Sequence, residues 1–177
     1  MKVFVLGESR TGTTSVHEYL VRSGLKSIHY FVPQSGVAEP IHRHRSTNWP
    51  KVRRFIETSG YDAFSDYPTR LFHRELTASF PDAFYILTVR REFAKWRASM
   101  NALLGEAQED INLLEAYYLC YNEEIRCNCA DLGRRFLELT IEDDADDNAR
   151  RISDFLGRPY SGPLLRLNTR EELALAG

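Results

Sequence analysis

Apolar residues follow two spacings along the chain: short continuous runs, and longer stretches with the period of a helix. The first run covers residues 2–6 and stops at Gly7, and the strongest covers residues 83–89. Uninterrupted apolar runs of this length are typical of parallel strands that are covered on both faces. By the same criteria we predict further strands at residues 26–32, 63–66 and 135–140.

Stretches of helical spacing separate these strands. A helix is predicted from Thr13 or Thr14 to about Ser23, where Gly24 ends it. Residues 33–48 hold turn formers and little periodicity, which predicts a loop. Further helices are predicted at residues 49–59, 68–80, 92–104, 110–131 and 145–156. The alternation predicts one α/β domain over residues 1–177, with a central parallel sheet flanked by helices in three layers.

Composition narrows the classes of protein that fit. Of 177 residues, 43% are hydrophobic and 12% are aromatic, enough for a packed core and too many for a disordered chain. No apolar run approaches the ~18 residues that a membrane-spanning helix needs. Three cysteines make no disulfide framework and lack metal-ligand spacing, so we expect a cytoplasmic protein without a metal. We expect Cys120, Cys127 and Cys129 to be buried in a helix.

Charge is distributed unevenly along the sequence. Residues 1–100 contain 15 Lys and Arg against 9 Asp and Glu, whereas residues 101–177 contain 8 against 16. Arginine supplies 19 of the 23 cations, and a guanidinium binds phosphate or sulfate through two hydrogen bonds at once. The basic half therefore favours an anionic ligand. Neither half has the strong basic character that nucleic-acid binding requires.

The turn between the first strand and the first helix has the features of a phosphate-binding loop. Gly7 and Gly12 have Gly-x4-Gly spacing, which lets backbone N–H groups point inward ahead of a helix N-terminus. Hydroxyl and cationic side chains fill the same turn: Ser9, Arg10, Thr11, Thr13, Thr14 and Ser15. The fold class is therefore an α/β domain of P-loop type.

The loop differs from that of nucleoside triphosphatases. Thr13 stands where those proteins have the lysine that binds the β- and γ-phosphates, and the cation of this loop is Arg10. The stretch Ser9-Arg10-Thr11-Gly12-Thr13-Thr14-Ser15 resembles the 5′-phosphosulfate loop of P-loop sulfotransferases of the bacterial type. This resemblance implies 3′-phosphoadenosine 5′-phosphosulfate as donor and no metal. It also implies that Arg10 neutralises the leaving phosphate while the loop holds that group.

A second segment matches the part of that family that binds the 3′-phosphate. There an arginine after a central strand is followed, eight residues later, by a helical serine. Arg91 and Ser99 have this spacing, and Arg90 is the second choice for the arginine. An arginine at the carboxyl end of a parallel strand is also where α/β sheets bind ligands. We therefore expect Arg90, Arg91 and Ser99 at the donor.

Transfer to a hydroxyl or an amine needs a general base. Asp66 ends a predicted strand, and its region resembles the place where some sulfotransferases carry a catalytic carboxylate. Its plainer interpretation is an N-cap for the helix at Pro68. His29, on another strand, is the rival base, since other members of the family use a histidine.

Two other functions remain open at this point. A P-loop kinase or phosphotransferase would need the missing lysine, and a binding module could keep the fold without turnover. A saccharide, a lipid or another small molecule could serve as acceptor. The residues do not indicate an oligomeric state.

Overall fold

The computed structural model describes residues 1–31, 44–104 and 111–167. Its five strands form one sheet in the order β2-β3-β1-β4-β5, and every neighbouring pair is parallel. The strands are β1 (Val3–Val5), β2 (Ser27–His29), β3 (Ala63–Ser65), β4 (Phe84–Val89) and β5 (Arg135–Thr140). The helices are α1 (Thr13–Arg22), α2 (Arg45–Thr58), the 3-10 helix η2 (Thr69–Phe72), α3 (His73–Ser79), α4 (Phe93–Leu104), α5 (Ile111–Asp131) and α6 (Ala145–Leu156).

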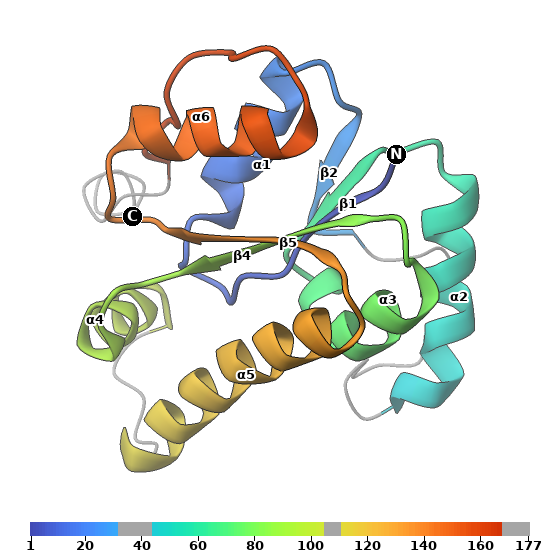
Figure 1. Ribbon diagram of the computed structural model, residues 1–177. Coiled ribbons are helices and arrows are strands. Elements are labelled where there is room, and N and C mark those ends of the chain that lie inside the picture. The colour runs from blue at the N-terminus through green and yellow to red at the C-terminus, as the bar shows by residue number, and fades with distance from the viewer. Residues whose placement is uncertain (32–43, 105–110, 168–177) are drawn as a thin grey trace.

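Helices cover both faces of the sheet, as Figure 1 shows. Side chains alternate across a strand, so Phe4 and Leu6 enter the core formed with α2, α3 and α5. Val3 and Val5 enter the opposite core, which α1 and α6 complete. The three-layer α/β fold predicted from the sequence is thereby confirmed, and the carboxyl ends of all five strands meet at one edge.

Two local predictions need correction. Helix α2 begins at Arg45 rather than Trp49, because the Arg45 guanidinium pairs with the Glu75 carboxylate at 2.7 Å and so anchors an additional turn. The helix predicted at residues 68–80 is divided, since η2 precedes α3. The predicted loop at residues 33–48 lies largely outside the described residues.

The cysteines also differ from expectation. Cys129 is buried, but Cys120 and Cys127 are exposed because α5 packs on the sheet through only one of its faces. In the part of the chain that the structure describes, no helix has both the length and the apolar character needed to cross a membrane.

His73, at the start of α3, is buried in this packing. Its ring meets Tyr121 edge-on, and its Nε2 atom lies 3.6 Å from the Glu124 carboxylate. Burial lowers the pKa of His73 to about 4, with Glu124 opposing part of that shift. The unfolded chain therefore binds the proton at a higher pH than the folded chain does.

We predict that this histidine makes the protein less stable in acid. Between pH 7 and pH 4.5 the unfolded state gains a proton that the folded state largely refuses, which lowers the free energy of unfolding by about 2 kcal/mol. Urea unfolding at both values, on the wild type and on His73→Phe, measures the contribution. Equal losses in the two proteins would contradict it.

Candidate active site

Four backbone carbonyl groups of the β1–α1 loop accept hydrogen bonds from side chains, and three of these side chains belong to other parts of the protein. Tyr121 donates its hydroxyl to Leu6 O at 2.5 Å, and the Trp96 indole N–H donates to Ser9 O at 2.9 Å. Arg90 Nε donates to Arg10 O at 2.9 Å. Inside the loop, Glu8 O accepts the Thr11 hydroxyl at 2.6 Å. These hydrogen bonds occupy backbone carbonyl oxygens, which carry negative partial charge and would otherwise repel an anion.

Both glycines of the loop are required by contacts. A Cβ atom on Gly7 would lie 1.9 Å from the Thr88 hydroxyl and 2.8 Å from the Thr88 carbonyl oxygen, so the loop lies directly against β4. Gly12 has φ +90°, and a Cβ there would meet Ile141 at 2.3 Å. Glycine is the residue that tolerates this backbone conformation and this close approach.

Helix α1 opens without a capping side chain. Its N-cap is Gly12, which has no side chain to accept hydrogen bonds from the amides of the first turn. Thr13, Thr14 and Ser15 supply those amides and line a cavity of about 790 Å³. A helix start of this kind favours an anion through its N–H groups and its dipole.

Arg10 connects the loop to α4. It has left-handed backbone dihedrals (φ 69°), and its Nε atom donates to the Ser99 hydroxyl at 3.0 Å. Arg90, at the end of β4, adds an ion pair with Glu142 at 3.2 Å. Arg10, Ser99 and Arg90 all line the cavity.

Arg91 lies differently. Its guanidinium pairs with Asp143 and is mostly exposed, and Arg91 is not among the residues that line the cavity. The structure therefore brings Arg90 and Ser99, rather than Arg91 and Ser99, to the same space. One residue of register separates the two arginines at the end of β4.

His29 and Asp66 meet at the carboxyl ends of β2 and β3. The His29 Nε2 atom lies 3.4 Å from Asp66 Oδ2 and 3.3 Å from the Thr14 hydroxyl, and Nδ1 is 2.9 Å from Ser65 Oγ. The parallel register His29↔Ser65 brings these strand ends together. Asp66 does not act as the side-chain N-cap that its position before Pro68 suggested, because η2 has no such cap.

The environment of His29 favours its neutral form. Burial lowers the pKa of His29, and the nearby carboxylates of Asp66 and Glu18 oppose that effect only in part. A neutral imidazole can accept a proton, so this side chain can serve as a base in neutral solution.

The remaining predicted residues divide into two groups. Ser9 and Gly12 line the cavity together with the residues described above, whereas Gly7 and Thr11 do not. Thr11 is buried, and its hydroxyl lies 2.9 Å from that of Thr88, so it supports the loop from behind.

Sequence reasoning missed several residues of the site. Glu8 is a buried carboxylate within the loop and pairs with Arg70 at 2.7 Å. Glu142 follows β5 and could have been found from its place at a strand end. Residues 164–167, three leucines and Arg166, also line the cavity, and the sequence carries no signal for them.

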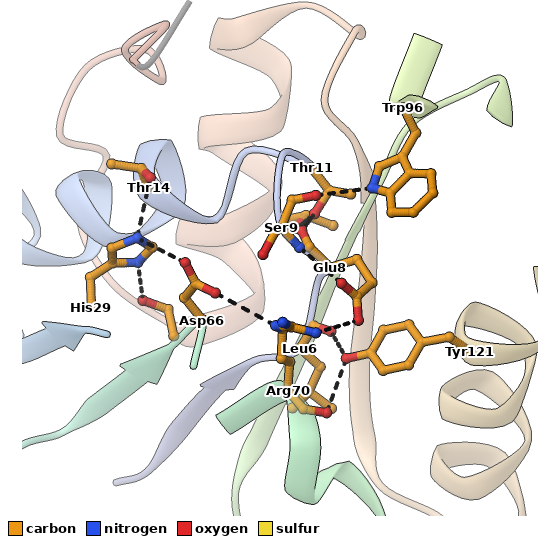
Figure 2. A network of polar contacts seen from close by, with 12 residues as sticks. Leu6, Glu8, Ser9, Thr11, Thr14, His29, Asp66, Arg70, Trp96 and Tyr121 are labelled. Atoms are coloured by element: carbon orange, nitrogen blue, oxygen red, sulfur yellow. Dashed lines mark hydrogen bonds and ion pairs between the residues drawn. The ribbon is translucent and has the colours of Figure 1, made fainter. Parts of the chain in front are cut away.

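No group of three or more His, Cys, Asp or Glu side chains suited to a metal occurs among residues 1–31, 44–104 and 111–167. Figure 2 shows instead a continuous polar chain that runs from Thr14 through His29, Asp66 and Arg70 to Glu8. Thr14, His29 and Asp66 line the cavity, and Arg70 and Glu8 continue the chain behind its wall.

A parallel sheet, a glycine-bounded loop before an uncapped helix and cationic side chains at one edge define an α/β protein whose cleft has the chemistry suited to an anionic ligand. The family described as "Sulfotransferase domain" matches residues 2–161. The chain belongs to this sulfotransferase family, as the resemblance of its loop implied. A search of curated proteins finds no match.

We predict that Gly7→Ala disturbs the loop more than a glycine change elsewhere. The added Cβ collides with Thr88, and overpacking of this kind costs typically 1–3 kcal/mol. Gly133→Ala is the matched control, since its Cβ meets nothing within 4 Å and only its left-handed φ of +60° is strained. Thermal unfolding compares the two. A smaller loss for Gly7→Ala than for Gly133→Ala would contradict the contact described here.

Proposed function

We propose that the chain transfers a sulfuryl group from 3′-phosphoadenosine 5′-phosphosulfate to a hydroxyl or amine of a small-molecule, saccharide or lipid acceptor, without a metal. Membership of the sulfotransferase family supports sulfuryl transfer in general. The choice of this donor is supported chiefly by the β1–α1 loop. Carbonyl groups of the loop are occupied by hydrogen bonds, while Arg10 and the start of α1 line the cavity. That arrangement suits a phosphosulfate.

In this proposal different residues of the cavity have different roles in the reaction. The loop amides and the hydroxyls of Thr13 and Thr14 hold the 5′-phosphate, and Arg10 stabilises the charge that grows on it as the S–O bond breaks. Arg90 and Ser99 hold the 3′-phosphate, since both line the cavity whereas Arg91 does not.

The acceptor enters at the His29–Asp66 end of the cavity. Its oxygen or nitrogen attacks sulfur and gives up its proton to His29, while Asp66 orients the imidazole. A histidine is the better-matched proton acceptor near neutral pH, because a carboxylate is a weak base unless its environment changes it.

The three free cysteines, two of them exposed, suit a reducing compartment, and we propose the cytoplasm.

Ligand binding separates this proposal from its alternatives. Calorimetry should show tight binding of 3′-phosphoadenosine 5′-phosphate and weak binding of ATP, with or without magnesium. We predict that Arg10→Ala lowers turnover with labelled donor about 10²- to 10³-fold, the effect of removing one group that stabilises transition-state charge. Arg53→Ala, which changes an exposed side chain on α2, is the control.

Other results would point elsewhere. Tighter binding of magnesium ATP would favour a phosphotransferase, and donor binding with no transfer to any acceptor would favour a binding module. Undiminished turnover in Arg10→Ala would remove the role assigned to that guanidinium.

The base can be identified from the pH dependence of kcat. Because burial holds the pKa of His29 below its usual 6.5, we predict a rate that stays level down to about that pH and then falls. His29→Gln should lower kcat roughly 10²-fold or more and remove this acid limb. Asp66→Asn should lower kcat less and move the limb to lower pH, because the carboxylate raises the pKa of His29. The opposite pattern, with Asp66→Asn the more damaging change, would make Asp66 the base.

A further inference from the structure

Arg70 lies behind the cavity wall and joins the β1–α1 loop to Asp66. It belongs to η2, and its Nη1 atom lies 2.7 Å from Glu8 Oε1, inside the loop that follows β1. Its Nε atom lies 3.8 Å from Oδ1 of Asp66, beside His29 at the other end (Figure 2). One guanidinium therefore faces both the proposed donor loop and Asp66, the partner of the proposed base His29.

The Glu8 end of this bridge is firmly fixed. The Glu8 side chain is 4% exposed and also accepts the Tyr117 hydroxyl at 2.7 Å and the Ser9 amide at 3.2 Å. Removing the arginine alone would leave a carboxylate buried without its counter-charge, which is strongly destabilising. Glu8 therefore holds the guanidinium in place under the loop.

At the other end, Arg70 faces the Asp66 carboxylate without a hydrogen bond to it. Arg70 Nε is buried and has no hydrogen-bond partner, and Asp66 Oδ1 lies just beyond hydrogen-bond distance from it. A buried donor without a partner is costly, so a small movement of Asp66 toward Arg70 would be favourable. The unpaired Nε–H group of Arg70 therefore favours movement of Asp66, and of His29 with it, toward Arg70.

We infer that Arg70 is a positioning residue that fixes the distance between the donor loop and the His29–Asp66 pair. The inference rests on the proposed function, in which the acceptor atom at one end attacks sulfur at the other. Such a displacement requires the reacting atoms about 3–3.5 Å apart and aligned, and a misplacement of about 1 Å can cost 10²-fold in rate. An arginine that Glu8 holds at one end is suited to set that separation, since its planar group offers several donors in a fixed geometry and its Nε faces Asp66.

We expect the bridge to act on the titration of His29 as well. The charged and titratable groups that face His29 are Asp66, which follows β3, and Glu18 and His17 from α1. Arg70 lies behind Asp66, with Glu8, Tyr117 and Tyr121 on its far side. Its positive charge favours the neutral imidazole, whereas Glu8 partly cancels that charge.

Two variants separate these effects. Glu8→Gln leaves Arg70 charged and free to approach Asp66, and the double variant Glu8→Gln/Arg70→Gln removes the bridge without leaving a buried unpaired charge. Arg126→Gln/Glu138→Gln is the matched control, because it removes an arginine–carboxylate pair of the same 2.7 Å length that lies between α5 and β5. The His29 resonance, assigned by its loss in His29→Gln, is titrated by NMR in the donor-free protein.

The expected midpoint of the His29 titration is lowest in Glu8→Gln and roughly half a pH unit or more higher in the double variant, with the control equal to wild type. The double variant should lose about 10²-fold in kcat while its affinity for 3′-phosphoadenosine 5′-phosphate changes only a fewfold. If the double variant does not fold, a lower midpoint in Glu8→Gln than in wild type still supports the bridge.

Equal midpoints in Glu8→Gln and wild type, or parallel losses of kcat and affinity in the double variant, would overturn the inference. The titration needs no turnover. A protein that transfers no sulfuryl group at all would therefore refute the proposed function, while the titration would still decide whether Arg70 couples the two ends.

Discussion

The contact of the β1–α1 loop with β4 is the constraint on which the rest of the site depends. Gly7 lies so close to Thr88 that no side chain fits between them, and the Thr11 hydroxyl reaches the same threonine. This contact fixes where the loop turns. Arg90 follows β4 directly, so the same contact also fixes where the Arg90 guanidinium meets the carbonyl of Arg10. The loop and the arginine are thus parts of one rigid unit.

Occupied carbonyls make that unit suited to an anion. A loop of free backbone presents oxygens as well as N–H groups, and the two largely cancel toward a phosphate. Here Tyr121, Trp96 and Arg90 each bind a loop carbonyl from outside, on α5, α4 and the end of β4. The packing of these elements against the sheet is therefore also what prepares the loop electrostatically, ahead of any ligand.

The sequence predicted the fold and the loop side of the cleft, for identifiable physical reasons. Apolar runs predicted all five strands, and β5 and α6 have the predicted bounds of 135–140 and 145–156. The loop was readable because glycines and hydroxyls are local signals. Which of Arg90 and Arg91 lines the cavity could not be predicted from the sequence, because it depends on how the end of β4 contacts Glu142. The start of α2 likewise depended on a tertiary ion pair with Glu75.

Long-range pairing explains why the Glu8–Arg70 bridge was invisible in the sequence. The two residues are 62 positions apart, and neither belongs to a motif that names a partner. A carboxylate within an anion-binding loop would even be read as unfavourable. Buried beneath the loop, however, it holds an arginine whose remaining donor faces the opposite end of the cleft. The unfavourable charge is thus neutralised by the same group that joins the two ends, and a loop built only for anion affinity would have no need of it.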